Sequence, residues 1–181
     1  MALSNSHLIT VDWCLSKNTC EPGLAWFKTL ASPEYTFRDL LAQAKRSREV
    51  WHVFWCLCRY LSDENRQTWA IDRAFTVLHE AEAEFADDPM SRRLLEYASK
   101  KEKPLIVELR PNKFGYESRG VSALQAAYMA SHADESSLIG EQSIRDAFKA
   151  VKARQRPKWL RETCELGVAL TEIGPNPSPK P

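Results

Sequence analysis

Apolar residues recur every three to four positions along most of the chain, and this spacing predicts helices rather than strands. The most apolar segment is residues 50–61, which we expect to form a central, nearly surrounded helix. The same pattern predicts helices over residues 5–17, 19–30, 36–44, 63–86, 89–101, 121–131, 141–154 and 159–171. The fold class expected is therefore all-α, an orthogonal helical bundle of about seven to nine helices.

Two local patterns bear on how these helices begin and pack. Thr36 stands three residues before Asp39, a spacing that resembles a capping box and predicts a helix start at Thr36. In the first expected helix, Leu8, Val11 and Leu15 are three to four residues apart. We expect these side chains, extended by Trp13 and Cys14, to share one apolar face that packs inward.

The helical pattern is interrupted near residues 102–120, where proline and glycine punctuate a short apolar stretch. We expect one long irregular loop there, which is either a functional surface or a join between two helical layers. The domain organisation predicted is a single helical domain over residues 1–173, with a candidate subdivision near 102–120. Residues 174–181 hold four prolines and are expected to be a disordered tail.

Composition limits the functional classes. The chain has 181 residues, 44% of them hydrophobic and only six of them Gly, which favours a helical core over a β-sandwich. Its formal net charge of +1 gives no overall field that would attract nucleic acid or a membrane. No segment approaches the roughly 20 apolar residues that span a bilayer, and no secretory signal opens the chain. We therefore expect a cytoplasmic protein with reduced thiols and no membrane partner.

Catalytic motifs are not found. The sequence contains no glycine-rich phosphate loop, no nucleophile elbow and no paired histidine metal motif. Four histidines are present (His7, His52, His79 and His132), and none lies in a pattern that identifies a base or a ligand. We expect a protein that is not an enzyme, with no catalytic residues and no cofactor. An enzyme with an unrecognised pocket stays as an alternative, which a cleft lined by His52 or His79 with carboxylates would support.

One set of residues could in principle bind zinc, namely Cys14, Cys20, His52 and Cys56. However, structural zinc sites favour Cys-x-x-Cys knuckles, whereas Cys56 and Cys58 are spaced for opposite sides of one helix. Buried cysteine behaves as a small hydrophobe. The interpretation favoured is that these are core thiols and that no metal is bound.

A basic segment is the candidate for nucleic-acid binding. From 149 to 161 it holds six basic residues, no acid and one tryptophan: Lys149, Lys152, Arg154, Arg156, Lys158, Trp159 and Arg161. Such residues could neutralise phosphates while the indole stacks on a base. The alternative is a solvated helix end, since basic side chains there complement the helix dipole.

An acidic surface is the candidate for binding a basic protein. Its five acids lie within nine residues: Glu80, Glu82, Glu84, Asp87 and Asp88. The alternative is ordinary solubilising charge. Tryptophans are frequent at interface hot spots, and the pattern does not place all six of them inside the fold.

Five short stretches of the chain form a recognisable series: the run from Cys20 to Phe27, the tryptophan-rich stretch 51–55, the helix 73–78, the acidic turn 87–89 and the alanine-rich stretch 123–133. Together they resemble an immunity-5-like family of small helical proteins from phages and prophages. The chain departs from the family pattern at 48–51, near Arg73 and in the longer loop 103–120. The resemblance implies a non-enzymatic protein that binds and neutralises another protein.

The function predicted is therefore a phage or mobile-element accessory protein that binds and blocks or neutralises another protein. An inhibitor of a host-defence complex fits this description. Nucleic-acid binding through residues 149–161 is the alternative, and a salt titration separates the two, because phosphate contacts weaken steeply with salt.

Overall fold

A computed structural model describes residues 8–84, 119–131 and 137–172. Within these residues the chain forms nine α-helices, one short 3-10 helix and one pair of two-residue strands. The all-α helical bundle predicted from apolar spacing is therefore confirmed. Several predicted features lie outside the described residues: the helix over 89–101, most of the loop at 102–120, Asp87, Asp88 and the tail at 174–181.

The chain divides into two compact units. Unit 1 comprises Met1–Tyr60 and Arg161–Pro181, and unit 2 comprises Leu61–Leu160. These boundaries differ in position from the subdivision suggested near 102–120. The single domain over residues 1–173 stays a prediction.

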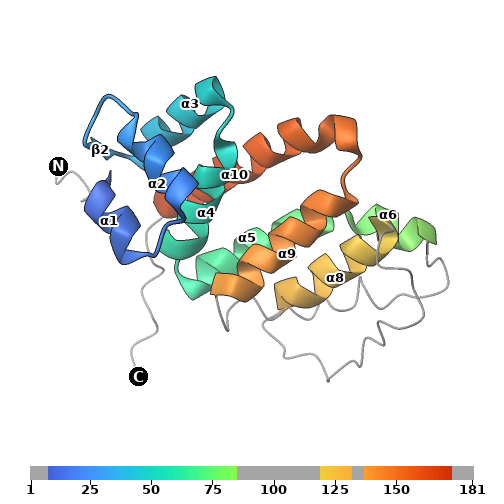
Figure 1. Ribbon diagram of the computed structural model, residues 1–181. Helices are drawn as coiled ribbons and strands as arrows, with labels where there is room; N and C mark the ends of the chain where they lie inside the picture. The colour runs from blue at the N-terminus through green and yellow to red at the C-terminus, as the bar shows by residue number, and fades with distance from the viewer. Residues whose placement is uncertain (1–7, 85–118, 132–136, 173–181) are drawn as a thin grey trace, which may run out of the picture. The chain divides into compact units, whose positions relative to one another are not determined.

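The described part of unit 1 begins with two short helices and a strand pair (Figure 1). Its elements are β1 (Ile9–Thr10), α1 (Val11–Ser16), α2 (Glu21–Lys28), β2 (Glu34–Tyr35), α3 (Phe37–Ser47), α4 (Val50–Tyr60) and the part of α10 (Arg156–Glu172) from Arg161 onward. The strands are antiparallel, with Ile9 opposite Tyr35. The predicted helix over 5–17 is thus wrong at its start, because Ile9 and Thr10 pair with β2 and the Thr10 hydroxyl then caps α1.

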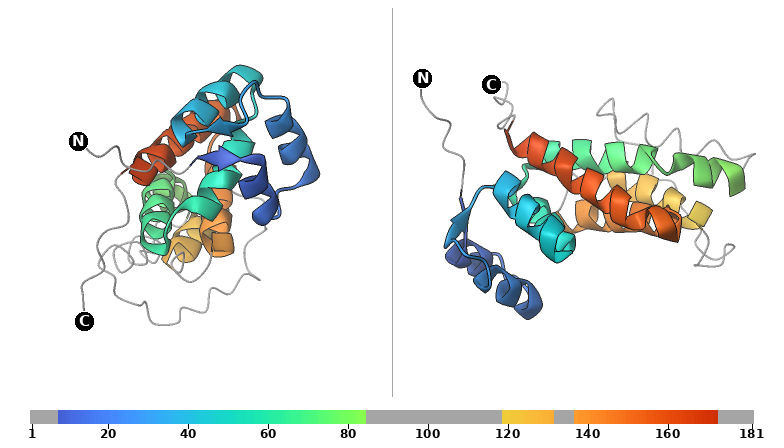
Figure 2. Two further views of the ribbon diagram at one scale, coloured as in Figure 1. Left: turned by 90° about the vertical axis from the view of Figure 1, so that its left-hand side faces the viewer. Right: turned by 90° about the horizontal axis from the view of Figure 1, so that it is seen from above.

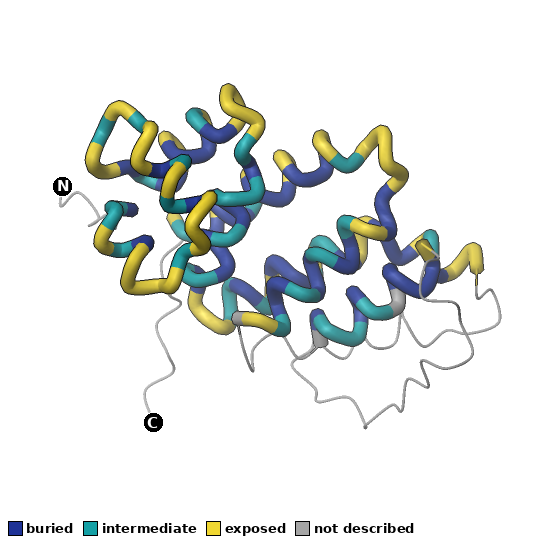
Figure 3. The backbone as a smooth tube through the Cα atoms, viewed as in Figure 1, coloured by how far each residue is buried: buried dark blue, intermediate teal, exposed yellow. Residues whose placement is uncertain are grey.

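Helix α4 forms much of the interior of unit 1, as its sequence predicted. Six of its eleven residues are buried, and Val53, Phe54 and Leu57 are completely so. Buried and half-buried stretches alternate along the helices, as Figure 3 shows. Trp51 and Trp55, which belong to the predicted apolar stripe, are only half-buried. The most buried face of the helix therefore includes Val53 instead.

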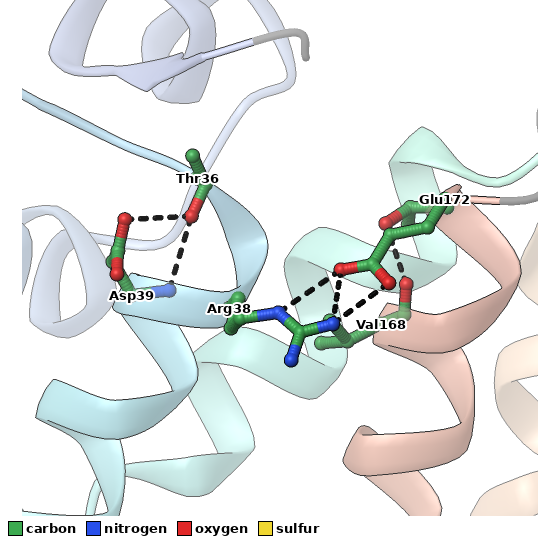
Figure 4. Close-up of polar contacts among 6 residues, drawn as sticks. Thr36, Arg38, Asp39, Val168 and Glu172 are labelled. Carbon is green, nitrogen blue, oxygen red and sulfur yellow. Dashed lines mark hydrogen bonds and ion pairs between the residues drawn. The ribbon is translucent and has the colours of Figure 1, made fainter. Parts of the chain in front are cut away.

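Helix α3 begins as the sequence predicted. The Thr36 hydroxyl accepts a hydrogen bond from the Asp39 amide at 3.1 Å and donates to the Asp39 carboxylate at 2.7 Å (Figure 4). In the first turn of the helix, the Arg38 guanidinium forms an ion pair with both carboxylate oxygens of Glu172 of α10, each at 2.8 Å. Lys45 pairs with Glu165 of the same helix. The C-terminal part of α10 is therefore joined to α3 within unit 1.

Unit 2 is built from helices that pack closely through small residues. Its described elements are α5 (Asp63–Phe75), α6 (Leu78–Glu84), α8 (Arg119–Ser131), α9 (Ser137–Ala150), the 3-10 helix η2 (Ala153–Gln155) and the first turn of α10. Helix α8 lies alongside α9 (Figure 1 and Figure 2). Ala123, Ala126, Ala127 and Ala130 of α8 are fully buried. The Ser143 hydroxyl of α9 donates to the Ala126 carbonyl at 2.9 Å, which requires a close approach of the two helices.

The long helix predicted over 63–86 is wrong in one respect, because it is two helices separated at Thr76. The Thr76 hydroxyl donates to the Arg73 carbonyl at 2.6 Å and accepts a bond from the Trp159 indole at 2.9 Å. These bonds fix Thr76 at the end of α5. Apolar spacing continues across the break, so it could not reveal the interruption.

Candidate functional site

Part of the predicted basic segment forms contacts within unit 2. The Lys149 ammonium lies 2.7 Å from the buried Asp146 carboxylate. The Arg156 guanidinium donates to the carbonyls of Val151 and Lys149 at 3.1 and 2.9 Å and lies over the Phe148 ring. Arg156 therefore ties the start of α10 to the end of α9, which is a structural role.

Trp159 also contacts protein rather than solvent. Its side chain is only 7% exposed, its indole nitrogen donates to Thr76, and the Arg73 guanidinium lies 5.9 Å from its ring centroid. A base could not stack on the ring without displacing these contacts. The basic residues of the segment that remain exposed are Lys149, Lys152, Arg154, Lys158 and Arg161.

The predicted acidic surface contributes to the join between α6 and α8. Glu80 forms an ion pair with Arg119 at 2.8 Å, and the Glu84 carboxylate accepts a bond from the Gly120 amide at 3.0 Å. Both contacts hold the N-terminal turn of α8, where a carboxylate complements unpaired backbone amides. Glu82 is exposed, and Asp87 and Asp88 lie outside the described residues.

The cysteines considered as zinc ligands separate into a buried pair and an exposed thiol. Cys14 and Cys56 are buried and hydrogen-bonded to each other. This bond lowers the pKa of Cys14 and, together with burial, raises the pKa of Cys56 well above its usual value. Cys20 is exposed. Across residues 8–84, 119–131 and 137–172, no three His, Cys, Asp or Glu side chains are grouped so that they could hold a metal ion.

The structure places His52 in a polar cluster that sequence reasoning did not identify. Its ring stacks on Trp26, with centroids 5.3 Å apart and planes inclined by 26°. The Trp26 indole nitrogen donates to the Ser47 hydroxyl at 3.1 Å. His52 Nε2 lies 3.2 Å from a Glu49 carboxylate oxygen. The three-residue spacing of Glu49 and His52 was the available signal, but nothing in the sequence places Trp26 beside them.

The first turn of α2 lies against the same histidine. A Cβ placed on Gly23 would lie 3.1 Å from His52 Nδ1 and 3.4 Å from the Cys20 sulfur. Glycine therefore allows the imidazole to approach the backbone of α2. His52 Nδ1 and the Cys20 sulfur both border the position that a Gly23 side chain would occupy. The other described histidine, His79, lies 3.4 Å from Glu80 and is mostly exposed.

The apolar face predicted to point inward from the first helix is at the surface of unit 1. Leu8 and Leu15 are 41% and 52% exposed, and Val11 is half-buried. The residues of this segment that are buried are Ile9, which belongs to the strand pair, and Cys14. The predicted interior face is therefore wrong for Leu8 and Leu15 and right for Cys14, because a strand at Ile9–Thr10 precedes a shorter helix than the spacing predicted.

Comparisons with family models, with curated proteins and with solved structures find no significant match to the chain. Among the described helices, none combines the length and the apolar character that crossing a bilayer requires.

Proposed function

We propose that this chain binds another protein and blocks or neutralises it by occupying its surface, without chemistry of its own. The observation that carries the proposal is the exposure of two large aliphatic side chains near the start of unit 1, Leu8 and Leu15. Covering a large aliphatic side chain stabilises a complex by about 1.5–3 kcal/mol. A few buried side chains supply most of the binding energy of an interface, and these leucines would be among them here.

The likeness to immunity-5-like phage proteins supports the same proposal and extends it. A protein of a mobile element gains from inactivating a host-defence complex, and a rigid helical surface can do so by steric blocking. The structure also makes a purely charge-based interface less suitable, because Glu80 and Glu84 form contacts within unit 2. The proposed interface is therefore apolar at its centre.

The test is a pull-down from the native host followed by titration of the purified partner. Leu15→Asp places a charge on the more exposed of the two leucines, and we expect it to weaken binding at least about tenfold, which corresponds to roughly 1.4 kcal/mol. Leu138→Asp is the matched control, because Leu138 is 64% exposed and belongs to unit 2. Circular dichroism checks that both variants keep their helices. Equal affinity of Leu15→Asp and the unchanged chain would remove the proposed interface.

Nucleic-acid binding is the second candidate, supported by the exposure of Lys152, Arg154 and Lys158. Charge reversal at Lys152 and Arg154 tests it without disturbing Arg156, which holds backbone carbonyls. Phosphate contacts predict an affinity that falls steeply with salt and that this double reversal abolishes. An interface through Leu15 predicts little response to either change.

A further inference from the structure

Cys20 is an accessible thiol at the start of a helix. It is the N-cap residue of α2, its side chain makes no capping hydrogen bond, and it is exposed. The other cysteines, Cys14, Cys56, Cys58 and Cys164, are buried. A dissolved reagent therefore meets Cys20 before any other thiol of the chain.

His52 is held with one nitrogen available toward this thiol. Its Nε2 faces the Glu49 carboxylate at 3.2 Å, so in the neutral ring the proton is placed on Nε2 and the lone pair on Nδ1. Stacking on Trp26 fixes the plane of the ring. Nδ1 then points to the first turn of α2, where the Cys20 sulfur also lies against Gly23. Direct contact between Nδ1 and the thiol would require the Cys20 side chain to rotate about its Cα–Cβ bond.

We propose that Cys20 is a modification site at which His52 activates the thiol for exchange with a low-molecular-weight disulfide. His52 Nδ1 takes the thiol proton, and the Cys20 sulfur attacks one sulfur of the disulfide. A bond forms between these two sulfurs while the disulfide bond of the reagent breaks. The second sulfur leaves as a thiolate and receives the proton from the imidazolium. The products are a mixed disulfide on Cys20 and one small thiol, so atoms and electrons balance.

The arrangement suits attack on sulfur better than attack on an acyl carbon. Acyl transfer needs backbone N–H donors aimed at the developing oxyanion. Pro22 lies in the first turn of α2 and has no N–H, which removes one donor beside Cys20. Displacement at sulfur needs no such donors, because the charge develops on the leaving sulfur and the imidazolium can protonate it. Glu49 acts as a positioning residue that orients the imidazole.

The experiment treats the full folded chain with the neutral reagent bis(2-hydroxyethyl) disulfide and follows each cysteine by peptide mass spectrometry. His52→Phe keeps a ring for Trp26 to stack on and removes the base, so we expect Cys20 to react at least about tenfold more slowly. Glu49→Gln should slow the reaction by less. Glu21→Gln, beside Cys20, and His79→Phe, on the other unit, are matched controls and should keep the original rate.

A second comparison distinguishes activation of the thiol by His52 from a purely structural role of this residue, and it needs no variant. A peptide of residues 15–28 contains Cys20 but no histidine. The folded chain is expected to react at Cys20 at least about tenfold faster than this peptide. An equal or slower rate in the folded chain overturns the proposal, even where His52→Phe fails to fold. The proposal is also overturned if any other cysteine reacts with the disulfide before Cys20 does.

Discussion

Gly120, at the start of α8, has no room for a side chain. An added Cβ would lie 2.6 Å from the Cβ and 2.8 Å from the Cδ of Glu84. The first of these atoms cannot move without the backbone of α6. We expect Gly120→Ala to reduce the free energy of unfolding by about 1–3 kcal/mol, measured by urea denaturation.

The direction in which Gly120→Ala changes the free energy of unfolding makes this test decisive. Replacing Gly by Ala inside a helix normally stabilises by about 0.5–1 kcal/mol. Glu84→Ala is the control, because it removes the hydrogen bond to the Gly120 amide without adding an atom. It should cost about 0.5–1.5 kcal/mol. A stabilised Gly120→Ala variant would contradict the close approach of α6 and α8.

The buried thiol of Cys164 links stability to alkaline pH. The Cys164 sulfur lies 3.8 Å from the Val50 carbonyl oxygen, and burial raises the pKa of this thiol far above its usual value. The folded chain therefore keeps this proton while the unfolded chain loses it above about pH 8.5. The stabilisation is complete below that pH and falls as pH rises, by up to about 1.4 kcal/mol per pH unit for this thiol.

Measuring the free energy of unfolding between neutral and strongly alkaline pH checks this linkage. Cys164→Ala should be less stable at neutral pH, because it leaves a small cavity, but its stability should decline less steeply with pH. Cys20→Ala is the matched control and should keep the original slope, since Cys20 is exposed. Parallel curves for Cys164→Ala and the unchanged chain would exclude the buried thiol as the cause.

At the scale of single elements, the start of α3 is the clearest case in which local sequence determines local structure. Thr36 and Asp39 exchange two hydrogen bonds at this end of the helix. We expect Thr36→Ala to lower the free energy of unfolding by about 1 kcal/mol, because one backbone amide loses its partner. Thr36→Ser keeps the hydroxyl and should lose little. Chemical denaturation of the two variants compares them, and an equal loss in both would show that the methyl group matters instead.

Other elements show where local pattern stops being sufficient. The break between α5 and α6 depends on Trp159, which is 83 residues away from Thr76 in sequence. Likewise, the short strand at Ile9, which replaces the predicted start of the first helix, depends on pairing with Tyr35. Apolar spacing identifies which segments are helical, but it carries no information about these distant partners. The outward face of Leu8 and Leu15 was mispredicted for that reason.

The candidate site was predictable only in parts, for the same physical reason. The sequence identified Cys20 and His52 as members of one set, but it grouped them by metal-ligand chemistry. Their observed relation instead depends on Gly23, which permits a close approach, and on Trp26, which orients the ring. Burial of Trp159 and the bonding of Arg156 likewise needed the packing of α9 and α10.

At the scale of the whole molecule, the two units differ in how the chain builds them. Unit 2 is one continuous stretch, whereas unit 1 takes residues from both ends of the sequence. The contribution of the C-terminal part of α10 to unit 1 includes buried Thr163, Cys164 and Val168 and the ion pairs to Arg38 and Lys45. A piece limited to residues 1–60 therefore lacks part of its own core.

This difference predicts how fragments behave. Residues 61–160 alone should be helical and unfold cooperatively, because the hydrogen bonds described above for unit 2 join residues of that stretch. Residues 1–60 alone should be largely unfolded, since exposing the apolar side of α4 costs more than local helix propensity returns. Adding a peptide of residues 156–181 should restore helix beyond the sum of the separate circular dichroism spectra. A folded 1–60 fragment, or no gain on mixing, would mean that α10 is dispensable to unit 1.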